Sequence, residues 1–137
     1  MTKEEIVQML KTDIKRWNDY IRQHPEEKID LSGVNLEGED LRTVVLRHAD
    51  LRGANLIKAN LMASDLEGAD LRGADLGFAS ISASNLSFAD FTGADVSFVN
   101  FRRCNMTGTK GLIPVNPWEY KIDPDTKTVR IVRDKPE

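Results

Sequence analysis

A large apolar residue recurs at every fifth position through the middle of the chain, and this spacing constrains the fold more than any other feature. An α-helix repeats about every 3.6 residues and a β-strand about every 2, so neither element explains a period of five. A fixed internal repeat instead indicates a solenoid, in which each unit packs only on its neighbours. The series consists of sixteen residues: Leu31, Leu36, Leu41, Leu46, Leu51, Leu56, Leu61, Leu66, Leu71, Leu76, Ile81, Leu86, Phe91, Val96, Phe101 and Met106.

The residues around each large apolar position indicate how one unit folds. Two positions before it the residue is mostly small, as at Ala49 and Ala69, and the position between is nearly always Asp or Asn. Residues two apart in extended backbone point to the same side. We therefore expect the large and small residues to face the interior and the Asp or Asn to face outward. A corner follows, where glycine at the last position eases the backbone.

The motif A-[D/N]-L-x-x, seen as A-D-L-R-G at 49–53 and 69–73, resembles the pentapeptide-repeat family. The resemblance covers residues 29 to about 108. It implies an all-β solenoid, a right-handed quadrilateral β-helix in which four units form one square coil of twenty residues. The sixteen units then make about four coils. Four glycines lie twenty residues apart, which agrees with a coil of that length: Gly33, Gly53, Gly73 and Gly93.

Both ends of such a stack expose unpaired backbone and apolar core, so we expect capping elements. Residues 1–28 are assigned to an N-terminal capping helix, which runs from residue 2 to about 23, and a linker. Thr2 and Glu5 form a capping box at its start, and His24-Pro25 ends it. The apolar stripe of this helix consists of Ile6, Leu10, Ile14, Trp17 and Ile21.

The five-residue period fails after Met106. The β-helix is therefore assigned to residues 29–109 and a C-terminal tail to residues 110–137. Within the tail, turn residues between two short apolar runs predict a β-hairpin with strands at 118–122 and 128–133.

The composition excludes several classes of protein. A formal net charge of -3 does not provide the concentrated basic surface that direct nucleic-acid binding needs. Cys104 is the single cysteine, so an intrachain disulfide is impossible. The N-terminus has no apolar signal segment, and no apolar run is long enough to cross a membrane. We therefore expect a soluble cytoplasmic protein that does not bind membranes.

We predict no catalytic, cofactor-binding or metal-binding residues. Catalytic carboxylates need a cleft that shifts their pKa values, whereas the repeated Asp and Asn residues are expected on a convex, solvated surface. His24, His48 and Cys104 lie far apart in the sequence, without the spacing of metal ligands. Cys104 occupies an inward position and is expected to pack as an apolar residue. The pattern therefore favours neither an enzyme nor a bound cofactor.

Two residues of the first coil depart from the repeat. Glu39 takes an inward position, where a charge is costly unless it is paired or near an end. We therefore expect a distorted coil beneath the N-terminal helix. Val45 stands where Asp or Asn is the rule, and its outward apolar side chain predicts a seat for the stripe of the helix.

The candidate interaction surface consists of Ile57, Trp118 and Tyr120 together with an aromatic pair, Phe78 and Phe98. Both take corner positions that point outward, and they lie twenty residues apart. We expect their rings to stack on one side of the solenoid above Lys58, with Ile57 nearby, and Phe88 to lie on the opposite side.

An exposed aromatic ladder generally marks a surface that something covers. Three occupants remain open at this point: the C-terminal tail through Trp118 and Tyr120, a partner protein, or a second copy of the chain. Simple exposure of the rings is the fourth alternative.

A function must be argued from a site and not from a fold. The aromatic ladder favours a non-catalytic protein-interaction or structural module, whose partner is another protein or, in a homodimer, a second copy. The resemblance implies a second hypothesis, because one branch of the family comprises gyrase-protecting proteins that imitate DNA. A DNA-mimicking modulator or protector of a type II topoisomerase needs a long rod with a concentrated negative surface. The repeat region, however, also carries Arg42, Arg47, Arg52, Arg72, Arg102 and Arg103.

Overall fold

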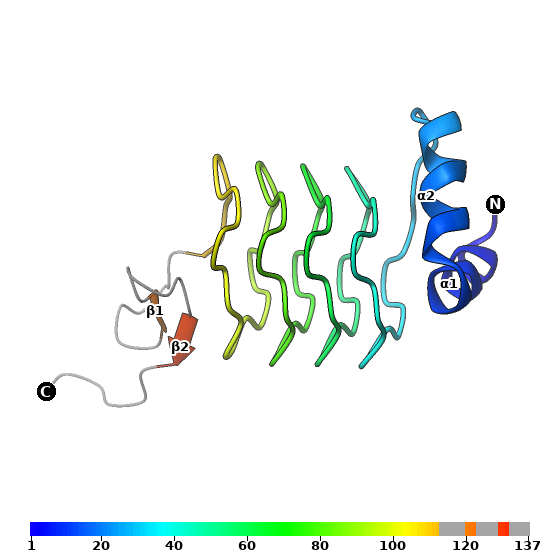
Figure 1. Cartoon of the computed structure of the whole chain (residues 1–137). Helices are drawn as coiled ribbons and strands as arrows, with labels where there is room; N and C mark the ends of the chain where they lie inside the picture. The colour runs from blue at the N-terminus through cyan, green and yellow to red at the C-terminus, as the bar shows by residue number, and fades with distance from the viewer. Residues whose placement is uncertain (113–119, 123–128, 132–137) are drawn as a thin grey trace, which may run out of the picture.

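The computed structural model describes residues 1–112, 120–122 and 129–131 of the chain. Two helices come first, α1 (Lys3–Thr12) and α2 (Ile14–Gln23), and two short strands come last, β1 (Tyr120–Ile122) and β2 (Val129–Ile131). Between them the chain winds into a stack of similar coils, with the helices lying at its N-terminal end (Figure 1). This arrangement is the solenoid that the five-residue period predicts.

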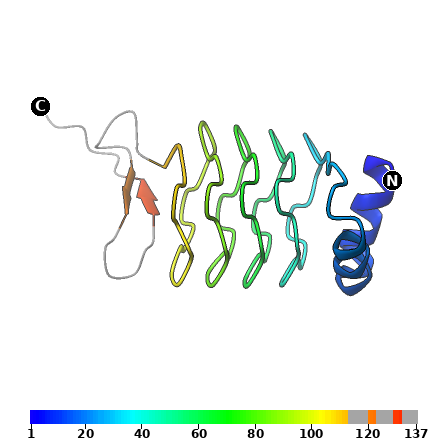
Figure 2. The same cartoon turned by 90° about the horizontal axis from the view of Figure 1, so that it is seen from above.

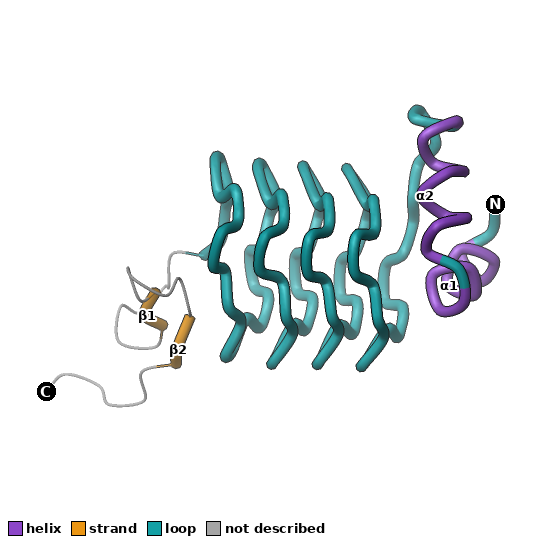
Figure 3. Tube along the Cα trace, viewed as in Figure 1, coloured by secondary structure: helices purple, strands orange, loops and turns teal. Residues whose placement is uncertain are grey.

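Parallel pairing between residues twenty apart holds the coils together. Asp30 pairs with Asp50, and Asp50 pairs in turn with Asp70. Leu31 N donates to Asp50 O at 2.8 Å, and Asp50 N donates to Ile29 O at 2.8 Å. Each extended segment contributes a single bridge before the next corner, so the coils are drawn as loops (Figure 3). The bridges continue in this way to the pair Asp90 and Lys110.

Each corner is a four-residue turn whose third residue has a positive φ angle. In the first one, Val34 N donates to Leu31 O at 3.3 Å and Gly33 has φ 69°. This geometry is that of a type II turn, which suits glycine at the third position. Other residues accept the same strained backbone at nine corners: Thr43, His48, Lys58, Ala63, Phe78, Ala83, Phe88, Phe98 and Arg103.

The outward Asp and Asn residues stabilise these corners. The side-chain oxygen of Asp50 accepts a hydrogen bond from Arg52 N at 3.1 Å, and that of Asn55 accepts one from Ile57 N at 3.0 Å. Both side chains form this local bond more readily than other residues do. The preference for Asp or Asn therefore reflects turn formation at the surface.

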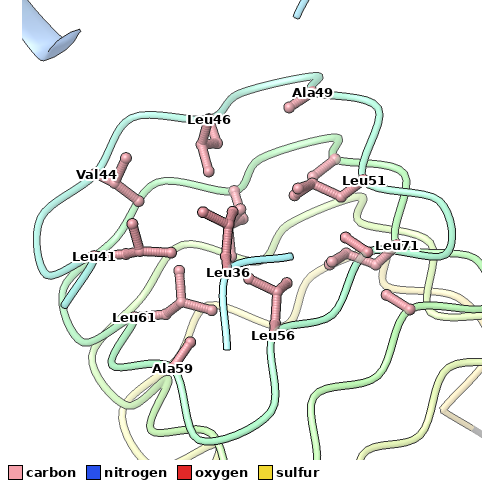
Figure 4. Packing of buried hydrophobic residues seen from close by; sticks show 14 of the residues in the cluster. Leu36, Leu41, Val44, Leu46, Ala49, Leu51, Leu56, Ala59, Leu61 and Leu71 are labelled. Carbon is pink, nitrogen blue, oxygen red and sulfur yellow. The ribbon is translucent and has the colours of Figure 1, made fainter. Parts of the chain in front are cut away.

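The core follows the predicted inward series. Leu36, Leu46 and Leu51 point into the interior of the coil from different sides, and each is 0% exposed (Figure 4). In the last coil the large residues include two aromatics, Phe91 and Phe101, which meet edge to face with ring centroids 6.0 Å apart. The prediction of inward and outward positions is confirmed.

The prediction of one continuous helix is wrong, because the chain breaks at Asp13. Asp13 has an extended φ of -155° and ends α1, while its carboxylate accepts a hydrogen bond from Arg16 N at 3.0 Å and caps α2. Asp is a favoured N-cap residue. At the start of α1, Glu5 N donates to Thr2 Oγ1 at 3.1 Å, which is one of the two bonds of the predicted capping box. The predicted end at His24 is confirmed.

Helix α2 docks on the open edge of the first coil through side chains that replace a missing strand. The amide of Asn18 donates to Thr43 O at 2.9 Å and accepts from Val45 N at 2.9 Å. The Trp17 indole donates to Val45 O at 2.8 Å, and its ring is buried. These contacts satisfy backbone groups that would otherwise face an absent neighbour. Val45 is therefore a seat for the helix, as predicted.

The expected distortion at Glu39 is wrong. Glu39 N donates to Leu36 O at 3.2 Å, and Glu39 O accepts from Asn60 N at 2.9 Å, as at the equivalent positions of other units. The side chain is only half-buried. A carboxylate that retains access to water carries a smaller desolvation cost, so the backbone keeps its regular path.

The two C-terminal strands pair antiparallel, with Tyr120 opposite Ile131 and Ile122 opposite Val129 (Figure 2). This pairing confirms the central part of the predicted hairpin. The predicted turn at 123–127 and the outer ends of both predicted strands lie outside the described residues.

Candidate interaction surface

Phe78 and Phe98 form an exposed stack of two aromatic rings. Their centroids lie 4.8 Å apart with 11° between the ring planes. The side chains remain 59% and 50% exposed, respectively. Most large apolar side chains of the solenoid are buried, so this pair stands out among the described residues. The predicted ladder is confirmed in its geometry.

The stack follows from the register of the coils. Phe78 N donates to Ser97 O at 2.9 Å, which fixes one corner directly beside the next. Both phenylalanines have a positive φ, 60° and 59°, at the third position of the turn. A non-glycine residue in this conformation costs roughly 1–2 kcal/mol. Glycine would form the same corner without this strain, so the fold does not require an aromatic residue there.

The structure describes only some of the other residues that were predicted for this surface. Ile57 is half-buried on the same corner column, and exposed Lys58 precedes the phenylalanines there, with Lys58 N donating to Gly77 O at 2.9 Å. Tyr120 lies in β1, where the structure describes the backbone alone, and Trp118 lies outside the described residues. We name Ile57, Phe78 and Phe98 the apolar strip. The role of this strip, and of Trp118 and Tyr120, in an interaction stays a prediction.

Phe88 occupies a different corner column and has a different environment. Its side chain is 62% exposed, with φ 60°. The ring lies over Gly108, because a β-carbon there would come within 2.5 Å of the ring. Phe88 therefore packs on the backbone of the next coil and lacks the aromatic neighbour that Phe78 and Phe98 share.

Arginine residues pair with half of the aspartates at the outward positions of the solenoid, namely Asp40, Asp50, Asp65 and Asp70. Arg52 Nη2 lies 2.7 Å from Asp50 Oδ2, and Arg52 Nε lies 3.8 Å from Asp70 Oδ2. Arg72 contacts Asp70 at 2.6 Å. Stacked like charges repel across neighbouring strands. Arg52 and Arg72 offset this repulsion between Asp50 and Asp70.

The same contacts shift the ionisation of these aspartates. Hydrogen bonds from the Arg52 side chain are the main cause that lowers the pKa of Asp50, and those from Arg72 lower the pKa of Asp70. Arg42 acts in the same way on the pKa of Asp40. The three carboxylates therefore stay charged at lower pH than free aspartate does.

Asp75 and Asp95 form a second stacked carboxylate pair, which sequence reasoning missed. They pair across neighbouring coils, and their Oδ1 atoms accept from Gly77 N at 3.0 Å and Ser97 N at 2.9 Å. Within residues 1–112, neither carboxylate forms an ion pair. The signal in the sequence is the absence of an arginine two positions after each aspartate. We name Asp75 and Asp95 the acidic pair.

The comparison with protein families identifies the repeat. The model of pentapeptide repeats (8 copies) matches residues 29–68 and 69–108. The chain belongs to the pentapeptide-repeat family. Pentapeptide-repeat proteins are generally non-catalytic modules, and their fold is the right-handed quadrilateral β-helix. No curated protein matches the chain.

Solved pentapeptide-repeat structures resemble this chain over part of their length. A protein of the Arabidopsis thaliana thylakoid lumen shares 38% identity, with 59% of this chain and 60% of that chain covered and a TM-score of 0.31. A protein of the cyanobacterium Cyanothece 51142 shares 29% identity over 59% of this chain and 55% of that chain, with a TM-score of 0.31. HetL of Nostoc, a protein involved in heterocyst differentiation regulation, shares 26% identity over 74% and 56%, with a TM-score of 0.40. The chain therefore spans less than two thirds of each of these relatives.

The remaining chemically reactive residues of this pentapeptide-repeat chain are dispersed. His24 caps the end of α2, and His48 lies at a corner of the solenoid. Cys104 is half-buried, and its Sγ donates to Ile81 O at 3.1 Å; burial raises the pKa of its thiol. Across the described ranges, no three His, Cys, Asp or Glu side chains gather as metal ligands.

A cleft of about 1080 Å³ lies where the end of α2 and the linker meet the first coil. Arg22 and Lys28 line it together with Glu26, Asp50 and Asp65, so its walls carry both signs of charge.

In the part of the chain that the structure describes, no helix has the length and apolar character to span a membrane.

Proposed function

We propose that this pentapeptide-repeat chain is a non-catalytic protein-interaction module: a β-helix of about four coils, capped by α1 and α2, that binds through the apolar strip. The observation that carries the proposal is the stack of Phe78 on Phe98, with its rings 4.8 Å apart and half or more of each side chain exposed. A folded chain leaves apolar area in water only at a cost of about 25 cal/mol per Å². Contact with another protein removes that cost.

The backbone at this corner gives further support. Phe78 and Phe98 both have the left-handed φ that glycine takes at other corners. Seven other non-glycine corners carry the same strain, so the exposed aromatic ring is what sets Phe78 and Phe98 apart from most of them. An aromatic residue that strains its turn and leaves its ring in water adds nothing to the folding of the free chain, so a binding role accounts for it better.

Charge pairing weighs against the alternative of DNA mimicry. A DNA mimic needs the unbroken negative field of a phosphate backbone. Asp40, Asp50 and Asp70 instead form ion pairs with arginines at 2.6–2.7 Å. The face that carries Asp50 and Asp70 is therefore close to neutral, which favours the interaction module.

The double variant Phe78→Ser/Phe98→Ser tests the proposal. The matched control is Phe88→Ser, which removes an equally exposed phenylalanine from a different corner column. For each protein we would measure the thermal midpoint, the mass by sedimentation equilibrium and the recovery of a partner from the native host. We expect the double variant to keep its fold and lose the partner, whereas Phe88→Ser should keep both the fold and the partner.

The other occupants give different results. A lower thermal midpoint in the monomeric double variant would identify the C-terminal tail, through Trp118 and Tyr120, as the cover of the strip. An unchanged midpoint with a smaller mass would indicate a homodimer. If midpoint, mass and partner recovery all match those of Phe88→Ser, the strip is not an interaction surface and the proposal is wrong.

A further inference from the structure

At the bridged positions of one row of the solenoid, carboxylates stand only beside the phenylalanines, although Glu37 on the first corner also accepts from Asn55 of this row at 3.3 Å. The outward residues of this row pair in sequence: Asn35 with Asn55, Asn55 with Asp75, and Asp75 with Asp95. The neutral Asn residues precede the corners that carry Gly38 and Lys58, whereas the acidic pair precedes the corners that carry Phe78 and Phe98. The charged and the aromatic residues therefore occupy the same two coils.

Hydrogen bonds hold the acidic pair at this corner. The residue before each phenylalanine donates its backbone N–H to the aspartate, Gly77 to Asp75 and Ser97 to Asp95. Ser97 Oγ also contacts the carboxylate of Asp95. Gly77 has no side chain that would shield the carboxylate of Asp75. Two carboxylates thus stand beside two exposed rings.

The neighbouring face shows which group such a pair accepts. Asp50 and Asp70 are bridged residues of consecutive coils, as Asp75 and Asp95 are. Arg52 lies between the first two, 2.7 Å from one carboxylate and 3.8 Å from the other. One guanidinium therefore spans a carboxylate pair of this spacing. The acidic pair offers the same two acceptors without an arginine among residues 1–112.

A second copy of the chain does not suit this surface. A fully buried phenylalanine contributes about 150–250 Å², so two half-exposed rings supply far less than the roughly 800 Å² per partner of a stable interface. A convex corner with two rings fits better into a groove or against an extended segment of a larger partner. The acidic pair then specifies the charge of that partner.

We propose that the partner presents an arginine to Asp75 and Asp95, next to an apolar residue that packs on Phe78 and Phe98. The guanidinium bridges the two carboxylates as Arg52 bridges Asp50 and Asp70, and it removes the repulsion within the acidic pair. This inference rests on the proposed function, since it assumes that the apolar strip is the binding surface. It adds the chemical class of the ligand, a segment that is both cationic and apolar.

Selection of random displayed peptides on the immobilised full-length chain tests this inference. We expect the enriched peptides to contain an arginine beside an apolar residue. For one enriched peptide, replacing the arginine with citrulline, its neutral isostere, should weaken binding about tenfold or more, because a charge-assisted pair in an interface is lost. The double variant Asp75→Asn/Asp95→Asn should weaken the arginine peptide to the same extent and leave the citrulline peptide unchanged.

These substitutions keep the fold, because Asn35 and Asn55 form the same turn hydrogen bond in the same row. Asp30→Asn/Asp90→Asn is the matched control, since it removes the same charge from another face. The variant without the acidic pair should unfold at the same temperature as the wild type or slightly above it, because like charges no longer face each other.

Three results would overturn the inference. The first is equal affinity for the arginine and citrulline peptides. If Phe78→Ser/Phe98→Ser still abolishes partner recovery in that case, the proposed function stands and only the arginine is wrong. The second is a lower thermal midpoint for Asp75→Asn/Asp95→Asn, which would place a cation of the chain itself on the acidic pair. The third is enrichment of the same peptides on the Phe78→Ser/Phe98→Ser variant.

Discussion

At the scale of single residues, the corners decide what each position tolerates. The third residue of every turn has a positive φ, and the side chain there points away from the core. This position therefore requires a positive φ angle, but the core does not restrict the size of its side chain. Residues as different as Gly33, Thr43 and Arg103 occupy it. Corner residues are consequently free to serve the surface, at a cost in backbone strain.

A pair of substitutions measures that strain. Gly73 has φ 68° and no atom near the place of a β-carbon, so in Gly73→Ala backbone strain should lower the free energy of unfolding by about 1–2 kcal/mol, less the roughly 0.5–1 kcal/mol of unfolded-state entropy that glycine no longer adds. Ala63→Gly relieves the same strain at another corner. Its gain should match the net loss for Gly73→Ala, because the same strain and entropy terms apply with opposite sign. Urea unfolding midpoints check both values, and identical midpoints for Gly73→Ala and the wild type would contradict the account.

At the scale of elements, α2 replaces a coil by side-chain chemistry. A further coil would present a backbone N–H and C=O to Val45, and Asn18 and Trp17 supply equivalent groups from a helix. Burying the apolar face of α2 against the first coil adds to this pairing. We therefore expect α2 to close this edge to pairing with other chains.

The Asn18→Ala variant tests the pairing at this edge. The change leaves Thr43 O and Val45 N without partners in a half-buried site, and each lost partner should cost about 1–3 kcal/mol. Gln8→Ala on the exposed side of α1 is the control, with an expected effect within about 0.5 kcal/mol. Thermal unfolding and light scattering would be followed together. If both variants unfold at the wild-type temperature without aggregating, α2 does not protect the coil edge.

The sequence predicts the elements to different extents. The period of five identifies the coils, the inward residues and the stack of Phe78 on Phe98, because each depends only on position within the repeat. The break at Asp13 is hidden, since both helices turn apolar residues toward the same coil and the stripe runs on across it. The role of Asn18 is hidden for a different reason. A lone buried amide has no periodic signal, and its partners lie 25 and 27 residues away.

At the scale of the whole molecule, the charges form rows along the stack instead of isolated pairs. Arg52 contacts Asp50 and Asp70, and Arg72 contacts Asp70 in turn. Each pair is largely exposed, and exposed pairs contribute little individually. The rows nevertheless allow aspartates of successive coils to stand side by side while the chain as a whole has a net charge of only -3.

The dependence of stability on pH should reveal these rows. The pKa values of Asp50 and Asp70 are lowered in the folded chain, so their contribution is complete above the pKa of unfolded aspartate and is lost as pH falls through the folded pKa values. The variant Arg52→Gln/Arg72→Gln lacks this contribution. Its deficit in free energy of unfolding should be largest near neutral pH and should shrink below about pH 4. Denaturant titrations across this range provide the check, and a deficit that does not change with pH would refute the account.

The register of the coils also determines what an insertion or deletion would do to this fold. Each unit contributes one side of a coil, and each residue pairs with the residue twenty positions along. Gain or loss of five residues preserves the alternation of inward and outward positions, but it moves every later residue to the next corner. Phe98 would then leave the column of Phe78 and turn toward another side. Insertions and deletions therefore act differently on core and surface: steps of five keep the hydrophobic interior, and only steps of twenty keep Phe98 on the column of Phe78.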